Sequence, residues 1–341
     1  MANPQAVDNL ADGIDLTSGE YRLRRRQIAM GSVFEIILDG DRDEVELRAL
    51  IESAFAEVVE PLEMQLSHYR SGSEISWINE NAHRGPVRVE PRLFDLLMEC
   101  ADLTSMTQGA FDVTIGPLVR CWGFHRKEGR VPSTEELAEV RERVGMEHVV
   151  LDAQAGAVAF DREGIELNLG GIGKGYVVDR VVEYLTRYGA HCALVASGGS
   201  TVYAMGVPPI SENGWHVGVR PAGAEGERIG SLHLTDAALS TSGDFRQHFV
   251  EGGVRYGHII DPRTGWPARG VRAACSVTAS GTRADALSTA FVVLGTEDTE
   301  SLCSKYGERA LLMSLNAENE PETRQFGQPI LEQARSMGGI S

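Results

Sequence analysis

The chain has 341 residues, 42% of them hydrophobic and 24% charged, so it can form one large globular unit or two closely joined ones. Its formal net charge of −17 argues against non-specific nucleic-acid binding and against attraction to anionic membranes, because both depend on basic surfaces. An anionic ligand would therefore need positive charge supplied locally.

The first residues carry neither the basic start nor the apolar run of a signal peptide, which predicts a cytoplasmic protein. No stretch approaches the ~20 apolar residues that a membrane-spanning helix needs. The five cysteines are odd in number and show no C-x-x-C spacing. This pattern favours buried free thiols over disulfides or a zinc site.

The N-terminal third of the chain alternates between polar and apolar stretches. Residues 1–25 are polar and predict a tail, and the apolar run 26–38 predicts a first strand. The helical spacing of apolar residues predicts one helix after Asp41 and another that begins at Pro91. Between them, residues 67–79 are rich in turn-forming residues and predict a loop.

The rest of the chain mixes short strands with helices. A capping box from Ser133 to Glu136 predicts a short helix. A buried helix is expected before Gly295, which would end it, and the segment 317–341 stays unassigned. Because no regular βαβ alternation appears, we expect an α+β domain over 26–316, with mixed or antiparallel sheets flanked by helices. Strands are expected over 148–151, 157–160, 165–169, 193–197, 201–205, 215–220, 229–234, 273–279 and 310–314.

A glycine-rich loop, Asn168-Leu-Gly-Gly-Ile-Gly-Lys-Gly-Tyr176, connects the expected strand 165–169 to a helix. Glycines there could adopt positive φ and let a ligand touch the backbone, while the helix N-terminus could bind an anion. The pattern matches neither the phosphate loop nor the dinucleotide fingerprint. A plain tight connection explains it about as well as a phosphate site does.

Asp285 and Thr289 stand four residues apart in an otherwise apolar helix, so their oxygens share one face. A carboxylate with a hydroxyl suits a hard cation such as Mg²⁺. From spacing alone, the structural interpretation is favoured, with Asp285 stabilising the helix dipole and Thr289 bonding back to a carbonyl.

Other candidates also have two interpretations. His258 precedes strong turn chemistry and could act as a general base or as a structural histidine. The hydroxyl cluster Ser240-Thr-Ser-Gly-Asp244 could line a ligand or form a capped turn. Tyr69 could stack on a flat ring or anchor a loop. Asp112 could bind a ligand amide or cap a turn.

Taken in order, these stretches resemble the ApbE-like FAD:protein FMN transferases over roughly residues 28–316. Each motif is weak alone, but eight in a fixed order form a strong signal. The matching stretches are Met30-Gly-Ser32, Leu66-Ser-His-Tyr-Arg70 with Ser73-Glu-Ile-Ser76 and Asn79, Gly109-Ala-Phe-Asp-Val-Thr-Ile-Gly-Pro-Leu-Val119 with Trp122-Gly-Phe124, Leu169-Gly-Gly-Ile-Gly-Lys-Gly-Tyr176 with Asp179, Ser197-Gly-Gly199, Ser240-Thr-Ser-Gly-Asp244, His258-Ile-Ile-Asp-Pro-Arg-Thr-Gly-Trp-Pro267, and Ala284-Asp-Ala-Leu-Ser-Thr-Ala290.

The resemblance implies a T-fold-like architecture and an Mg²⁺-dependent transfer of FMN from FAD to a Thr or Ser of a target flavoprotein domain, with release of AMP. It implies that Asp285, Thr289 and the carbonyl of Gly171 hold the metal, with Ser288 at a further position of the metal site. His258 corresponds to the base that accepts the proton of the target hydroxyl. The implied FAD contacts are Met30, Tyr69, Ala110, Phe111, Asp112, Asn168, Lys174 and Ile260.

The chain departs from the family pattern in the charge of this site. Asn168 stands where the family commonly has Asp, and Ser288 stands where some members carry a second carboxylate. Two alternatives therefore remain open: an FAD pyrophosphatase that gives FMN and AMP, and a non-catalytic FAD-binding module. Most members are exported, so a periplasmic location is the alternative to the cytoplasmic one.

Overall fold

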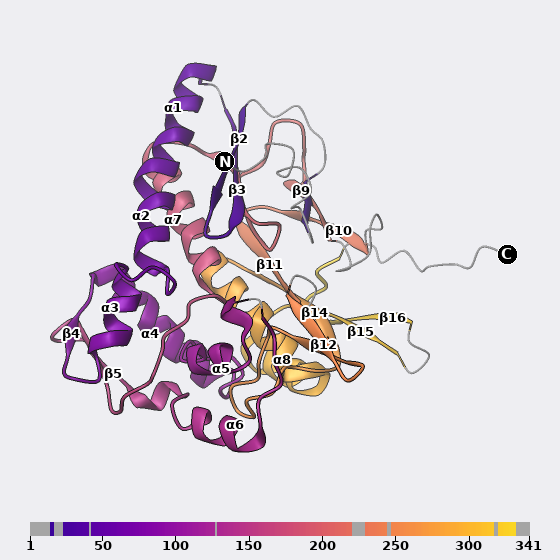
Figure 1. Cartoon of the computed structure of the whole chain (residues 1–341). Coiled ribbons are helices and arrows are strands. Elements are labelled where there is room, and N and C mark those ends of the chain that lie inside the picture. Colours follow the sequence, from indigo (N-terminus) through magenta and orange to yellow (C-terminus); the bar gives the residue numbers. More distant parts are fainter. Residues whose placement is uncertain are drawn as a thin grey trace.

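An eight-stranded antiparallel sheet forms the centre of the molecule (Figure 1). The computed structural model describes residues 14–16, 23–40, 42–126, 128–219, 229–243, 247–316 and 320–331. In spatial order, the central strands are β16 (Pro321–Phe326), β15 (Ala310–Leu315), β14 (Val271–Thr278), β11 (Ala237–Gly243), β8 (Thr201–Met205), β7 (Cys192–Ser197), β3 (Ser32–Asp39) and β2 (Leu23–Ala29).

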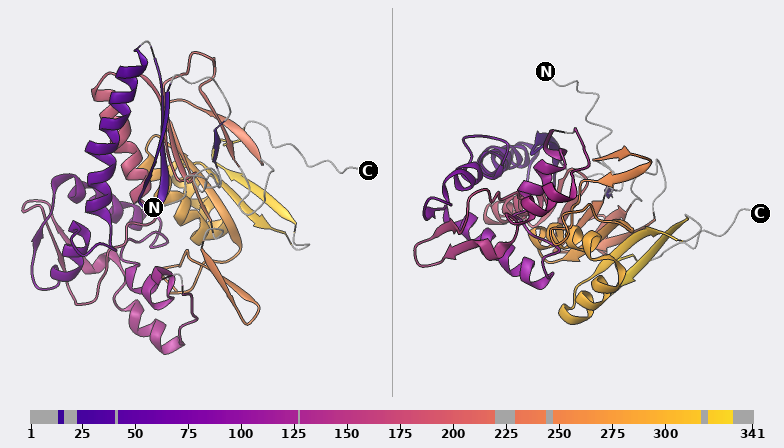
Figure 2. Two further views of the ribbon diagram at one scale, coloured as in Figure 1. Left: turned by 45° about the horizontal axis from the view of Figure 1, so that its top comes forward. Right: turned by 60° about the horizontal axis from the view of Figure 1, so that its bottom comes forward.

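Helices cover one face of this sheet and a small antiparallel sheet covers the other (Figures 1 and 2). Because side chains alternate across a strand, Ile36 of β3 packs among the helices and Ile37 packs against the small sheet. The covering helices are α1 (Glu44–Ala54), a π-helical turn η2 (Phe55–Val59), α2 (Glu60–Leu66), α7 (Gly173–Arg187) and α8 (Gly281–Tyr306). The small sheet contains β1 (Ile14–Leu16), β9 (Trp215–Val219) and β10 (Gly230–Leu234).

The segment between α2 and α7 builds a further lobe beside the helical layer (Figure 1). Its helices are α3 (Glu74–Asn81), α4 (Pro91–Met106), α5 (Gly116–Cys121), α6 (Thr134–Arg141) and the short 3₁₀ turns η3 (Phe124–Arg126) and η4 (Met146–His148). Its strands are β4 (Val87–Arg88), β5 (Val149–Asp152) and β6 (Ala157–Phe160), and a separate hairpin is formed by β12 (His248–Glu251) and β13 (Val254–Gly257).

Several expectations from the sequence are confirmed. The fold is α+β, and the paired strands in the described part of the chain are antiparallel within the named sheets. The capping box of Ser133 and Glu136 is formed at the start of α6. All five cysteines are buried free thiols. Gly295 breaks α8 with non-helical dihedral angles, at the residue that was expected to end the buried helix.

Three local expectations were wrong. The run 26–38 is a hairpin rather than one strand, because Met30 and Gly31 turn the chain at positive φ. The polar stretch 67–79 contains the start of α3, whose N-cap is Ser73. Residues 165–169 form no strand and make only an isolated bridge between Glu166 and Ile115.

Strands also extend the fold at both ends beyond the expected domain. Within the stretch expected to be a tail, β1 pairs with β9 and β2 begins at Leu23. Within the segment left unassigned, β16 pairs with β15 and forms one edge strand of the large sheet. No helix in the described ranges is both long and apolar enough to cross a bilayer.

Asp179 of α7 joins the two helices that will carry the site. Its carboxylate accepts hydrogen bonds from the backbone N–H groups of Gly281 and Thr282, at 2.6 and 2.8 Å. It also accepts from the hydroxyls of Ser280 and Thr282, at 2.8 and 2.6 Å. A carboxylate at a helix N-terminus satisfies N–H groups that have no partner within the helix and favours the helix dipole. Asp179 therefore fixes where α8 begins relative to α7.

We expect Asp179→Ala to lower the free energy of unfolding by about 2–4 kcal/mol, because four donors at a helix start lose a charged acceptor. Urea denaturation with far-UV circular dichroism measures this change. Glu300→Gln removes an exposed charge from α8, the helix that Asp179 caps, and serves as the control. A loss no larger than that of the control would contradict the capping role of Asp179.

Candidate active site

The glycine-rich loop after Asn168 uses its glycines for close packing rather than for unusual dihedral angles. None of Gly170, Gly171, Gly173 and Gly175 has positive φ, so the expectation of a positive-φ loop was wrong. Close approach does occur at this loop, but to the backbone of another helix rather than to a ligand. A Cβ on Gly175 would lie 2.0 Å from the carbonyl oxygen of Gly281, which rules out a side chain there.

Asp285 lies against the first turn of α7 as a consequence. Its carboxylate is only 2% exposed, and Oδ2 accepts a hydrogen bond of 3.0 Å from the backbone N–H of Gly175. The Lys174 ammonium is 3.7 Å from the same oxygen and donates to the Gly170 carbonyl at 3.2 Å. The helix N-terminus, considered from sequence as a phosphate site, thus binds the protein's own carboxylate.

Four hydroxyls gather around Asp285 from two elements. Ser240 of β11 donates to Oδ1 of Asp285 at 3.3 Å. Ser242, two residues further along the same face of β11, lies 2.8 Å from the Ser288 hydroxyl and 3.0 Å from that of Thr289. Ser288 and Thr289 donate to the Asp285 carbonyl at 2.9 and 3.2 Å. The cluster is therefore oxygen-rich, continuous and largely buried.

Gly171 packs directly beside this cluster. A Cβ on Gly171 would lie 3.3 Å from the Thr289 hydroxyl oxygen and 3.5 Å from the Phe111 ring. The three residues that the resemblance implies as metal ligands, Gly171, Asp285 and Thr289, thus come from two segments that meet here.

The chemistry of the donor set fits a hard divalent cation. Across the described ranges, no group of three or more His, Cys, Asp or Glu could hold a metal ion. A cation here would rely on the Asp285 carboxylate, hydroxyl oxygens and backbone carbonyls. Mg²⁺ accepts such a set, since it is commonly held by one or two carboxylates together with water and substrate phosphates. The Lys174 ammonium beside Asp285 marks the position as one where positive charge is favourable.

Asn168 adjoins the cluster and binds His68. The backbone N–H of Gly170 donates to Oδ1 of Asn168 at 2.9 Å, which turns the amide nitrogen toward Nε2 of His68 at 3.4 Å. An amide nitrogen can only donate, so Nε2 of His68 is the acceptor and the imidazole is neutral. Burial, reinforced by the nearby positive charges of Arg120 and His125, lowers the pKa of His68 to about 4.

Tyr69 extends this corner of the site outward. Its ring lies 3.8 Å from the His68 ring, tilted by 41°, and its side chain is 65% exposed. Burial of part of the side chain raises the pKa of Tyr69. An exposed ring backed by an imidazole can accept a flat ligand ring against its free face.

Met30 also approaches the loop, because its methyl carbon is 3.5 Å from the place of a Cβ on Gly173. Two further implied contacts, Ala110 and Phe111, are buried in the turn after α4. Asp112 is already occupied, since it accepts from the backbone and hydroxyl of Thr114 and from the N–H of Met146 at 3.0 Å. Burial raises the pKa of Asp112 despite these hydrogen bonds.

His258 and Ile260 follow directly after the β12–β13 hairpin. Nδ1 of His258 lies 3.1 Å from the backbone carbonyl oxygen of Gln247. Ile260 packs into a cluster that includes Trp122, Phe124 and Trp266. Trp122 donates to the Gly265 carbonyl at 2.8 Å, so this cluster also anchors the turn after Ile260.

The sequence motifs assigned no role to three residues of this region. His68 and Asp179 belong to stretches that were recognised as motifs, but neither was given a role. Gln247 stands in no recognised stretch, and only its spatial closeness to His258 identifies it. By contrast, the hydroxyl cluster at Ser240 was noticed from its composition, although Asp244 lies outside the described residues.

The chain is similar to known proteins over most of its length. The sequence profile of the ApbE family matches residues 30–313. The FAD:protein FMN transferase of Treponema pallidum is 31% identical over 311 residues, covering 86% of this chain and 85% of that protein. The one from Vibrio cholerae is 33% identical over 248 residues, covering 70% and 72%.

Solved structures show the same fold. The ApbE protein of Thermotoga maritima superimposes with a TM-score of 0.79 at 29% identity, over 89% of this chain and 96% of that one. The flavin transferase ApbE of Vibrio cholerae gives a TM-score of 0.78 at 28% identity, over 89% and 96%. The fold and the sequence together define a flavin-transferase class of protein. The chain belongs to the ApbE family.

We expect His68 to stay neutral down to a pH near 4, and Asn168→Asp to raise its pKa, because a carboxylate facing Nε2 would favour the imidazolium. The folded-state pKa lies below the 6.5 of the unfolded chain, so the contribution of His68 to stability is complete above pH 6.5. It is lost as the pH falls from there toward 4. Histidine NMR titration of both proteins measures the pKa, with His68→Gln assigning the signal. An unchanged pKa in Asn168→Asp would contradict the contact.

Proposed function

We propose that the chain transfers FMN from FAD to a Thr or Ser hydroxyl of a target flavoprotein domain and releases AMP. The observation that carries this proposal is the packing of Asp285, its hydroxyl neighbours and Lys174 against the Gly170–Gly171 backbone, in a chain of the ApbE family. The exposed ring of Tyr69 supports binding of a flat flavin or adenine ring near this cluster.

The reaction exchanges the phosphoanhydride bond of FAD for a phosphoester bond to the target hydroxyl. The oxygen of the target hydroxyl bonds to the phosphorus of the FMN half of FAD. The bond from this phosphorus to the bridging oxygen breaks, and AMP leaves with that oxygen. Attack on a pyrophosphate is favoured when positive groups neutralise its non-bridging oxygens, and Lys174 supplies such a charge.

Mg²⁺ is part of the proposal. Asp285, Thr289 and the Gly171 carbonyl would hold the ion, with the Ser288 hydroxyl beside them. When bound, it would supply Lewis-acid neutralisation of the pyrophosphate oxygens. The Gly175 N–H and the Ser240 hydroxyl hold the Asp285 carboxylate in place, so this group needs little rearrangement when a cation and FAD bind.

His258 is the proposed base for the target hydroxyl. A backbone carbonyl only accepts, so the contact with Gln247 requires that Nδ1 of His258 carries the ring proton. In the neutral imidazole, Nε2 then has the lone pair and can take the proton of the attacking hydroxyl. The side chain of Gln247 donates to the carbonyl of Phe124 at 2.6 Å. This hydrogen bond fixes Gln247, whose own backbone carbonyl contacts His258, against the aromatic cluster. Gln247 is therefore a positioning residue.

The function is tested with purified protein, FAD, Mg²⁺ and a Thr-containing flavin-acceptor domain. Release of AMP and in-gel fluorescence of the acceptor are expected together. We expect Asp285→Ala to reduce the rate roughly 10²-fold or more, since the site loses its one central carboxylate. Asp298→Ala, exposed on the same helix, should keep full activity. AMP with free FMN would instead indicate an FAD pyrophosphatase, and the absence of AMP would refute both enzymatic functions.

We expect Gln247→Ala to lower kcat about tenfold with an unchanged KM for FAD, because a slightly misplaced base slows proton transfer without removing FAD contacts. Gln154→Ala, in an exposed turn, is the control. If Gln247 acts through His258, its substitution has no further effect in a His258→Ala background. An undiminished tenfold effect there would show that Gln247 acts in another way.

A further inference from the structure

Two histidines of the small sheet lie side by side, outside the region that the proposed reaction uses. His216 of β9 is directly opposite His233 of β10 in the antiparallel register. Their ring centres are 5.0 Å apart, and the ring planes are inclined by 34°. Opposite residues of an antiparallel pair have close Cβ atoms, so their side chains can bind one ligand together. Imidazole is the commonest metal ligand of proteins.

Anchored strands hold both histidines on the outer face of the small sheet. The residues that alternate with them are buried in the cluster between the two sheets: Trp215, Val217, Leu232 and Leu234. Because side chains alternate across a strand, His216 and His233 point to the opposite face, where both are half-buried. The Trp215 indole N–H donates to the Met205 carbonyl at 3.1 Å, which ties β9 to the central sheet.

The spacing of the two rings matches that of two imidazoles bound to one metal ion. An imidazole nitrogen binds Zn²⁺ at about 2.0–2.1 Å, and the ring centre lies about 1.1 Å behind that nitrogen. Two rings on one ion, at an angle of about 90–110°, therefore have centres roughly 4.5–5.2 Å apart. The observed 5.0 Å falls within this range. Each imidazole has two ring nitrogens, so one can bind the ion while the other keeps a hydrogen bond.

The chemistry of the ligands selects a transition ion over Mg²⁺. Imidazole suits Zn²⁺, Cu²⁺ and Ni²⁺, whereas Mg²⁺ prefers oxygen ligands such as those around Asp285. The two places also lie on opposite sides of the central sheet, because the small sheet covers the face away from α7 and α8 (Figures 1 and 2). The net charge of −17 attracts cations to the molecule in general.

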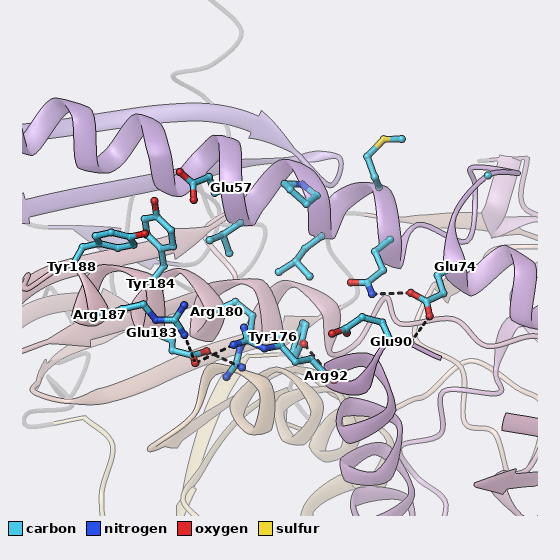
Figure 3. A pocket seen from close by; sticks show the side chains of 16 residues that line it. Glu57, Glu74, Glu90, Arg92, Tyr176, Arg180, Glu183, Tyr184, Arg187 and Tyr188 are labelled. Atoms are coloured by element: carbon cyan, nitrogen blue, oxygen red, sulfur yellow. Dashed lines mark hydrogen bonds and ion pairs between the residues drawn. The ribbon is translucent and has the colours of Figure 1, made fainter. Parts of the chain in front are cut away.

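The glutamates of a groove along α7 do not offer a comparable site. This groove of about 760 Å³ is lined by four of them, Glu57, Glu74, Glu90 and Glu183 (Figure 3). Glu183 pairs with three arginines at 2.9, 3.5 and 3.6 Å, and Glu74 accepts from the Gln65 side chain at 2.8 Å. Among the described residues, no three of His, Cys, Asp or Glu come together as a metal site. The histidine pair is therefore the better ligand set for a transition ion.

We propose that His216 and His233 form a two-histidine site for a divalent transition ion of the Zn²⁺, Cu²⁺ or Ni²⁺ type. The ion joins β9 to β10, and water completes its coordination, so the ion exchanges with solvent. It stabilises the small sheet for as long as it is bound. This site is separate from the Asp285 cluster and does not depend on the proposed function.

Isothermal titration calorimetry of the full chain, without an added histidine tag and with Mg²⁺ in excess, tests the site with Zn²⁺ as the probe. We expect His216→Asn and His233→Asn each to weaken Zn²⁺ binding about 10²-fold, because each leaves one ligand of the pair. His191→Asn removes an exposed histidine elsewhere and should leave the affinity unchanged. Unchanged affinity in the two variants, or no Zn²⁺ binding by the wild type, would overturn the proposal.

Two further measurements locate the ion. The EPR spectrum of bound Cu²⁺ should show coupling to two nitrogens in the wild type and to fewer in either variant. Asp285→Asn should keep the Zn²⁺ affinity, and a loss of binding there but not in the histidine variants would place the ion at the Asp285 cluster. Zn²⁺ should raise the melting temperature of the wild type and not that of the histidine variants. Equal melting temperatures without Zn²⁺ show that these variants fold.

Discussion

The close crossing of α7 and α8 at Gly175 and Gly281 is the constraint on which the rest of the site depends. A Cβ at either position would lie within 3 Å of the backbone carbonyl of the other. Without side chains there, the first turns of the two helices touch, and each receives a carboxylate from the other helix. Asp285 of α8 accepts from the N–H of Gly175, and Asp179 of α7 accepts from the first N–H groups of α8. This reciprocal capping fixes both helices before any ligand binds.

The reciprocal caps also decide how phosphate can be recognised. A free helix N-terminus would attract a phosphate through its N–H groups and dipole. At α7 that field acts on Asp285, so the loop presents a carboxylate together with the Lys174 ammonium. The loop has the sequence of a phosphate-binding loop, but its surroundings are rich in oxygen atoms and favour positive charge. Anion recognition by this loop then relies on the positive charge of Lys174 and, in the proposed function, also on Mg²⁺.

Local sequence patterns predicted most helices and strands, but they did not predict contacts between residues far apart in the sequence. The cap at Ser133, the break at Gly295 and the apolar stripe of α8 each act within a few residues, so the sequence reveals them. Asn168 and His68 are 100 positions apart in the sequence, so no local pattern can predict their contact. The prediction of positive φ for the loop glycines was wrong. Glycine is used both where the backbone adopts positive φ and where two backbones touch, and the sequence does not distinguish these two uses.

The balance of charge explains why Ser288 suits this version of the site. Its side chain is fully buried and is hydrogen-bonded to the Asp285 carbonyl and to the Ser242 hydroxyl. A carboxylate at that position would put a second negative charge into a buried cluster that contacts the Lys174 ammonium, and burial would impose a large desolvation cost on it. With Ser288 and Asn168 neutral, Asp285 and Lys174 nearly cancel. A divalent cation would then add net positive charge, which is what a doubly negative pyrophosphate requires.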